Sequence, residues 1–183
     1  RWQTGRNGAV EQLGDCSLCT LNAFAKGWIV DRAVEHLTKH HAVQTVTVNA
    51  GGDLHRSGAD PLIVGIENPF RPFDNEPPIA AISVSNAAVA TSGSARKSFR
   101  IGGRKFGHVI DPRSGWPVEA IVSVSVVANT AATADALATI LGVQQPTDAI
   151  GEANEMGIPI FIVDGDGRQH RSEPWKHIEV DLS

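Results

Sequence analysis

The chain has 183 residues, of which 42% are hydrophobic, and these numbers predict a single globular domain over residues 1–183. The formal net charge of -4, with no run of Lys and Arg, argues against a nucleic-acid surface. No apolar stretch is long enough to span a bilayer as a helix.

The N-terminal segment predicts two short strands, 8–13 and 17–21, around a turn at Gly14-Asp15. Cys16 and Cys19 form a lone C-x-x-C motif at the second strand. Without a second pair this motif is a weak signal for zinc or redox chemistry, and residues three apart in a strand face opposite sides. We therefore interpret the two cysteines as small, half-buried residues.

The segment Ala23 to His41 has the apolar spacing of a helix. Lys26 and Asp31 fall on its polar face. Gly27 lies within the pattern, where glycine costs about 1 kcal/mol, so it predicts close approach of a backbone or a ligand. The apolar stripe expected to be buried comprises Phe24, Ile29, Val30, Ala33, Val34 and Leu37. The histidines that complement the helix dipole at its C-terminal end are His36, His40 and His41.

The β-branched run Thr45 to Asn49 predicts a strand, and it leads into Ala50-Gly51-Gly52-Asp53. Paired glycines after a strand leave backbone N–H groups free to approach a phosphate, but they equally form turns. Pro61 to Ile66 is another predicted strand. The next segments are a surface loop over Asn68 to Pro78, which holds four prolines, and one strand over Ile79 to Ala90.

Gly102-Gly103 predicts a hairpin between Lys97 to Ile101 and Arg104 to Ile110. His108 lies near the end of its second arm, and a turn at Asp111-Pro112 follows the arm. His108 and Asp111 fit either a general base with its neighbour or an exposed turn. From the residues alone the turn is favoured.

The alternating apolar run Ile121 to Ala128 predicts a strand, and Thr130 to Gly142 predicts the helix that follows it. Thr130 or Thr133 can cap the start of this helix, and Leu137, Ile140 and Leu141 are expected to be buried.

On this helix Asp135 and Thr139 are four residues apart and therefore share one face. A carboxylate and a hydroxyl side by side suit a hard cation such as Mg²⁺. The alternative is that Asp135 only complements the helix dipole.

A second helix is expected over Thr147 to Met156, stopped by Gly157, and a last hairpin joins Ile158 to Asp164 with the residues from Gln169 onward. Strands outnumber helices and do not alternate with them regularly. The fold class predicted is therefore α+β, with a largely antiparallel sheet and packed helices.

Six blocks of residues carry a family resemblance. They are Ala25-Lys26-Gly27-Trp28-Ile29-Val30-Asp31, Val48-Asn49-Ala50-Gly51-Gly52-Asp53, Val64-Gly65-Ile66-Glu67-Asn68-Pro69, Ala90-Thr91-Ser92-Gly93, His108-Val109-Ile110-Asp111-Pro112-Arg113-Ser114-Gly115 and Ala134-Asp135-Ala136-Leu137-Ala138-Thr139. In this order and spacing the chain resembles the ApbE family of FAD:protein FMN transferases. The resemblance implies a tunnelling-fold-like core. It also implies a Mg²⁺-dependent reaction that splits FAD, attaches FMN to a Thr or Ser hydroxyl of an acceptor protein and releases AMP.

The resemblance also implies roles for particular residues of this sequence. His108 matches a histidine that helps to deprotonate the accepting hydroxyl. The Mg²⁺ ligands implied are Asp135, Thr139 and the backbone carbonyl of Ala23. The implied contacts with the flavin nucleotide are made by Thr20, Lys26, Gly52, Asp53 and the backbone of Ile110.

Two departures from the family pattern leave other readings open. Thr20 stands where the family has an Asp that contacts FAD, and the family domain extends further at its N-terminal side. The alternatives are a homologue that binds FAD or hydrolyses its pyrophosphate, and a non-catalytic domain that retains only the fold. Family members are commonly exported and lipid-anchored, which favours the bacterial periplasm or cell envelope, with an unseen anchor as the means of membrane association.

Overall fold

The computed structural model describes residues 2–6, 8–12, 20–41, 43–73, 75–94 and 98–181, the side chains of Trp2, Gln12, Arg104 and Lys105 excepted. The prediction for Cys16 and Cys19, and most of the strand predicted over 17–21, lie outside these residues. The helices are α1 (Ala25–His40), α2 (Ala131–Gly142), α3 (Pro146–Met156) and α4 (Glu173–Lys176). The strands are β1 (Trp2–Thr4), β2 (Val10–Gln12), β3 (Val46–Ala50), β4 (Asp53–Ser57), β5 (Leu62–Ile66), β6 (Ala80–Val84), β7 (Ala87–Gly93), β8 (Ser98–Ile101), β9 (Arg104–Gly107), β10 (Ile121–Ala128), β11 (Ile160–Asp164), β12 (Gln169–Arg171) and β13 (Glu179–Val180).

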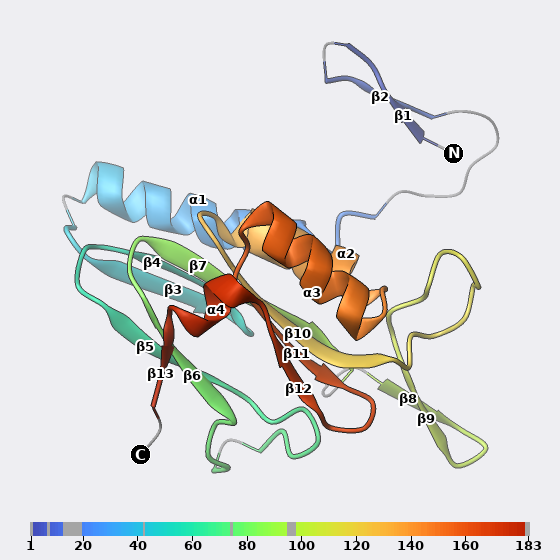
Figure 1. The fold of residues 1–183 in the computed structure, drawn as a ribbon. Coiled ribbons are helices and arrows are strands. Elements are labelled where there is room, and N and C mark those ends of the chain that lie inside the picture. The colour runs from blue at the N-terminus through green and yellow to red at the C-terminus, as the bar shows by residue number, and fades with distance from the viewer. Residues whose placement is uncertain are drawn as a thin grey trace.

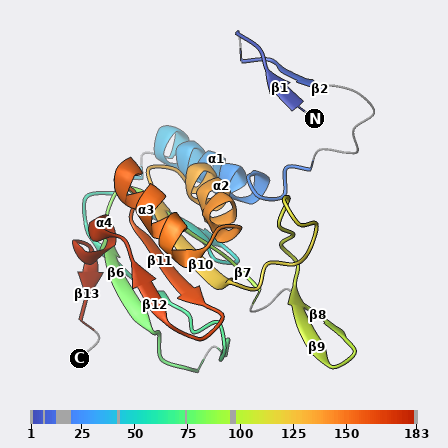
Figure 2. The same cartoon turned by 45° about the vertical axis from the view of Figure 1, so that its right-hand side comes forward.

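The centre of the molecule is a six-stranded sheet in the order β12-β11-β10-β7-β4-β3. Helices α1, α2 and α3 cover one face of this sheet, and the three-stranded sheet β13-β6-β5 lies on the other (Figures 1 and 2). Every strand pair within the described residues is antiparallel. The α+β prediction is therefore confirmed.

The period-2 alternation of the central strands divides the core into two layers. Val124 and Val126 of β10 pack with Ala138 and Leu141 of α2 on the helix side. One residue further along β10, Val127 packs on the opposite side of the sheet. The cluster on that side also holds Val89, Phe161, Val163, Ile82 and Trp175.

The helix ends follow the local signals in the sequence. Thr130 is the N-cap of α2, and its hydroxyl accepts the N–H of Thr133 at 3.1 Å. Gly157 ends α3 in the left-handed conformation, with φ of 67°.

The buried face of α2 differs in part from the predicted one. Ile140 was expected to be buried, and this prediction was wrong, because its side chain is 52% exposed. The stripe of α2 that meets the sheet is made of smaller residues, Ala131, Ala134 and Ala138, together with Leu141.

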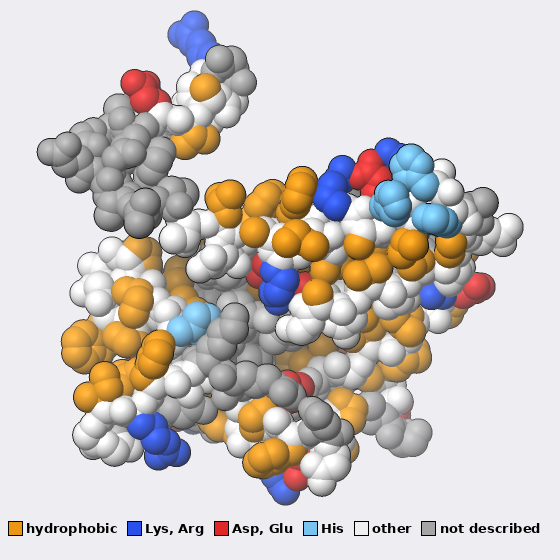
Figure 3. Space-filling view, turned by 180° about the vertical axis from the view of Figure 1, so that it is seen from behind, with side chains coloured by type: hydrophobic (Ala, Val, Ile, Leu, Met, Phe, Trp, Pro, Cys, Tyr) orange, Lys and Arg blue, Asp and Glu red, His pale blue; other side chains and the backbone are white. Residues whose placement is uncertain are grey.

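Helix α1 also departs in part from its predicted apolar face. Val30 and Val34 are buried as expected, but Phe24 and Ile29 are 43% and 60% exposed. Figure 3 shows hydrophobic side chains along the outward surface of this helix and the histidine cluster at its C-terminal end. No helix within the described ranges combines the length and hydrophobicity needed to cross a membrane.

The single strand predicted over Ile79 to Ala90 was wrong. It is two strands, β6 and β7, which belong to different sheets. The chain turns between them at Asn86, a non-glycine residue with φ of 46°. The side chain of Asn86 accepts the N–H of Gly58 at 2.8 Å, so a partner distant in the sequence stabilises this turn.

Strand β4 was not predicted, and it contributes directly to the site described below. Gly51 and Gly52, with φ of 63° and 100°, form a two-residue turn between β3 and β4. Leu54 pairs with Val89 across the sheet, and His55 pairs with Ala88. Asp53 and His55 therefore share the face of β4 that lies beneath the helices.

Candidate functional site

An acidic site forms where the first residue of β4 meets the first turn of α1. Asp53 is fully buried, and its Oδ1 accepts a hydrogen bond from the ammonium of Lys26 at 2.5 Å. The side chain of Lys26 is 38% exposed, so the cation lies between the buried carboxylate and solvent. Two residues expected to contact a nucleotide are thus brought together as an ion pair.

The second carboxylate comes from α2. Asp135 is buried and lies close enough to Asp53 to act on its protonation. Burial raises the pKa of Asp53 to about 6, Lys26 opposes the rise, and the neighbouring Asp135 adds to it. Both carboxylates have a buried Oδ2 without a hydrogen-bond partner. Two such groups can remain side by side only if they share a proton or a cation.

Thr139 lies one turn beyond Asp135, and its hydroxyl donates to the Asp135 backbone carbonyl at 3.2 Å. Ala23, the third predicted metal ligand, lies in the turn that precedes α1. Among the described residues, no group of three or more His, Cys, Asp or Glu side chains is arranged to hold a metal ion. A cation here would therefore rely on two carboxylates supplemented by neutral oxygens, a set that suits Mg²⁺ better than a transition metal.

Two residues that hold this site together were missed or misread in the sequence. Asp31, assigned to the polar outer face of α1, is buried instead. Its Oδ1 and Oδ2 accept the N–H groups of Ala131 and Ala132 at 2.8 and 2.9 Å. His55 contributes a third bond, from Nδ1 to Asp31 Oδ1 at 2.6 Å. The signal available was the phase of the helix, because Asp31 lies four residues after Gly27 and three before Val34, on the same buried face.

Gly27 explains how the two helices approach so closely. A Cβ built on this glycine would lie 2.3 Å from the carbonyl oxygen of Ala131. Of the two readings of Gly27, close approach of a backbone is therefore the one observed. Lys26, Gly27 and Asp31 thus form three separate links from α1 to the acidic site.

His108 lies elsewhere, at the base of the loop between β9 and β10, where it is exposed. This loop is ordered by Arg113, which donates from Nε to Asp111 Oδ1 at 2.8 Å and also bonds the carbonyl of Val143 after α2. Arg113 holds the pKa of Asp111 below its usual range. Ile110, 49% exposed, forms an isolated bridge with Pro117 in the same loop.

The remaining predicted contacts are at the surface. Thr20 is exposed ahead of α1, and Gly52 is exposed in the β3–β4 turn. The N–H of Gly52 donates to Asn49 Oδ1 at 3.2 Å, which favours the turn reading of the glycine pair. The roles of Thr20 and Gly52 toward a nucleotide stay predictions.

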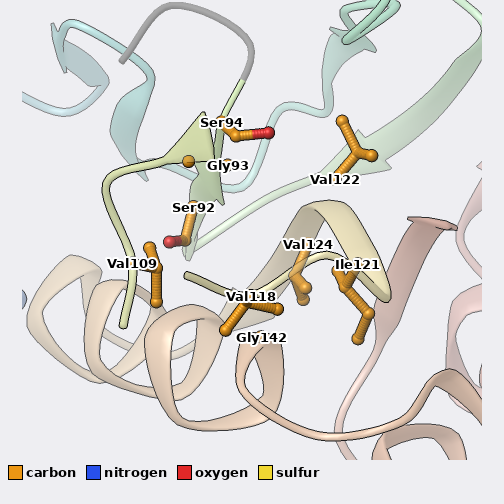
Figure 4. Close-up of a pocket in the computed structure, with 10 residues that line it drawn as sticks. Ser92, Gly93, Ser94, Val109, Val118, Ile121, Val122, Val124 and Gly142 are labelled. Atoms are coloured by element: carbon orange, nitrogen blue, oxygen red, sulfur yellow. The ribbon is translucent and has the colours of Figure 1, made fainter. Parts of the chain in front are cut away.

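A small cavity lies beside the loop that carries His108. Its volume of about 20 Å³ suffices for roughly one water molecule and not for a nucleotide. Figure 4 shows Val109 and Val118, from the two sides of the loop, near Gly142 at the end of α2. Neither Asp53 nor Asp135 lines this cavity, so the acidic site is a separate feature.

Comparison with known proteins agrees with this architecture. The family model described as the ApbE family matches residues 3–162. A FAD:protein FMN transferase of Vibrio cholerae is 32% identical over 164 residues, which are 85% of this chain and 48% of that protein. The crystal structure of the ApbE protein of Thermotoga maritima superposes with a TM-score of 0.78 at 32% identity, covering 88% of this chain and 53% of that one. The crystal structure of the apo flavinyl transferase ApbE of Pseudomonas stutzeri superposes with a TM-score of 0.70 at 28% identity, covering 86% of this chain and 50% of that one.

This chain spans about half the length of the relatives it matches. The match nevertheless extends over most of the chain itself, in sequence and in fold. The chain therefore belongs to the ApbE family.

Proposed function

We propose that this chain carries the acidic centre of a FAD:protein FMN transferase. The reaction breaks the bond between the FMN phosphorus and the bridging oxygen of FAD, joins that phosphorus to a Thr or Ser oxygen of an acceptor protein, and releases AMP. The observation that carries the proposal is the pair of unpartnered buried oxygens on Asp53 and Asp135, beside the cation of Lys26. Relatives named as FAD:protein FMN transferases supply the reaction class.

The donor set fits Mg²⁺. Asp135 and Thr139 on α2, with the backbone carbonyl of Ala23, are the proposed ligands, and Asp53, whose Oδ2 has no hydrogen-bond partner, lies near Asp135. Mg²⁺ is commonly held by one or two carboxylates while substrate phosphates and waters complete its shell. When bound, the ion would neutralise negative charge on the pyrophosphate oxygens.

Lys26 would also neutralise negative charge on the pyrophosphate. Its ammonium is partly exposed next to a site that has to accept a polyanion. An ammonium beside the pyrophosphate would orient it and offset its charge, and this is the form of catalysis that phosphoryl transfer mainly uses.

His108 is proposed as the general base. It accepts the proton of the Thr or Ser hydroxyl as that oxygen attacks the FMN phosphorus, and its exposed position leaves it open to an acceptor protein. The proposed partners are therefore FAD and a protein with a Thr- or Ser-containing flavinylation motif.

The test is a time course of covalent flavin attachment to such an acceptor, with AMP release followed in parallel. We expect His108→Ala to slow transfer by about 10²–10⁴-fold while FAD affinity changes only a few-fold. Equal transfer rates in wild type and His108→Ala would exclude the general-base role. Release of AMP and FMN from FAD without any protein labelling would instead indicate a FAD pyrophosphatase.

A further inference from the structure

We propose that Asp31 and His55 are positioning residues, which fix the first turn of α2 and thereby place Asp135 and Thr139 for cation binding. The inference rests on the proposed function, because it takes these two α2 residues as Mg²⁺ ligands. Neither Asp31 nor His55 is proposed to contact the ion.

The start of α2 is held from outside the helix to an unusual degree. Four N–H groups at a helix start have no partner within the helix when it stands alone. Here those of Ala131 and Ala132 donate to the two oxygens of Asp31, and that of Thr133 donates to the Thr130 hydroxyl. Asp31 thus supplies two of these bonds, each assisted by its charge, and also complements the positive end of the helix dipole.

His55 fixes the carboxylate that does this. Both oxygens of Asp31 already accept backbone N–H groups, so the carboxylate is the acceptor and His55 Nδ1 carries the proton. The side chains of His55 and Asp31 are 16% and 8% exposed, and a nearly dry environment strengthens this bond.

The register of α1 against β4 couples this pair to the acidic site. Asp53 and His55 lie two residues apart on one face of β4, a separation of about 6.7 Å. Their partners Lys26 and Asp31 lie five residues apart on α1, which is a rise of about 7.5 Å. The pairs Asp53–Lys26 and His55–Asp31 therefore form side by side, and both join β4 to α1.

The consequence reaches Asp135 through the helix itself. Asp135 follows Ala131 by four residues, so it lies one turn further along the same face, about 6 Å from the clamped N–H group. A rotation or a fraying of the first turn would move the Asp135 carboxylate away from Asp53. Outer partners that orient ligands in this way typically affect metal affinity by about 10–100-fold.

The experiment is calorimetric titration of the full chain with Mg²⁺ alone, with the melting temperature measured for each variant. We expect Asp31→Asn to weaken Mg²⁺ binding by about 10–100-fold. The matched control is Thr130→Ala, which removes the other side-chain cap of the same helix. It should lower the melting temperature, but it should leave Mg²⁺ affinity within about twofold, because the two bonds from Ala131 and Ala132 to Asp31 still hold the first turn in place.

A second pair of variants covers the case in which Asp31→Asn does not fold. Asn at position 55 can place an amide N–H near the position of Nδ1, whereas Leu cannot donate. His55→Asn should therefore stay within about threefold of wild type, and His55→Leu should lose about tenfold.

The outcomes separate this inference from the proposed function. If Asp135→Ala abolishes binding while Asp31→Asn and His55→Leu bind like wild type, the positioning role is wrong and the metal site stands. If Asp135→Ala binds Mg²⁺ like wild type, or wild type does not bind it, the metal assignment fails and the positioning role fails with it.

Discussion

The contact between α1 and α2 at Gly27 can be tested by adding a single methyl group. In Gly27→Ala the new Cβ would lie 2.3 Å from the oxygen and 2.5 Å from the carbon of the Ala131 carbonyl, whereas ordinary contact begins at 3.4 Å. These are backbone atoms, so no side chain can rotate away. The helices would have to separate by about 1 Å, as overpacked cores do when they shift their backbone.

That separation also affects the hydrogen bonds of Asp31. Bonds of 2.8 and 2.9 Å to Ala131 and Ala132 would lengthen beyond the usual range. Overpacking destabilises a protein by about 1–3 kcal/mol, and the loss of hydrogen bonds to a charged group destabilises it by a further ~1.5–3 kcal/mol. The higher helix propensity of Ala compared with Gly offsets about 1 kcal/mol of this loss. We therefore expect Gly27→Ala to lower the free energy of unfolding by about 2–5 kcal/mol.

The assay is urea unfolding followed by far-UV circular dichroism in metal-free buffer. Gly151→Ala is the matched control, because Gly151 also lies within a helix but has nothing within 4 Å of its added Cβ. This control should gain about 0.5–1 kcal/mol. If Gly27→Ala is as stable as wild type or more stable, as the control should be, the close approach of the helices is refuted.

Three further predictions concern buried polar groups. Because burial raises the pKa of Asp53 from 3.8 to about 6, the native state binds its proton more tightly than the unfolded chain does. As the pH rises from about 4 to about 6, the unfolding free energy of the metal-free wild type should therefore fall relative to that of Asp53→Asn, by at most about 3 kcal/mol. Urea unfolding curves that show a constant difference between the two proteins over this pH interval would contradict the assignment. The hydrogen bond from His170 lowers the pKa of Asp164, so Asp164→Asn should destabilise the protein at pH 7 by a margin that shrinks as the pH falls below 4, as thermal melts at each pH would show. Ser172 is fully buried and its hydroxyl accepts the N–H of Ile160 at 2.9 Å, so Ser172→Ala should lower the unfolding free energy by about 1–3 kcal/mol in urea titrations; a loss below about 0.3 kcal/mol would mean that water replaces the hydroxyl.

Elements with local signals could be predicted from the sequence. The helix α2 and the strand β10 have an apolar pattern with caps or flanking turns, and both are found close to their expected bounds. The Gly-Gly hairpin β8–β9 is also found, but its second arm ends at Gly107 and not at Ile110. The break at Asn86 could not be predicted in this way. Its turn depends on hydrogen bonds with Gly58, which is far away in the sequence.

In the candidate site, too, residues with a local signal or a family match could be predicted, and residues that depend on distant partners could not. Asp135 was identified from its spacing with Thr139 and from the family resemblance, Lys26 from the resemblance alone, and the structure brings both to Asp53. Asp31 was assigned to the polar face of its helix because of its charge, and His55 was missed because its strand, β4, was not predicted. Asp31 can be buried because His55 and the start of α2 satisfy its oxygens, and His55 is paired in turn with Asp31; none of these partners is near in the sequence.

The hydrogen bonds from Ala131 and Ala132 to Asp31 join residues 100 and 101 positions apart in the chain. Amides at the very start of a helix ordinarily have no partner within the helix and exchange their protons rapidly with solvent. Here both amides point at a buried carboxylate on another helix, so they can exchange only when α1 separates from α2. Their deuterium uptake would therefore report the free energy of undocking of the two helices, separately from the unfolding of either one.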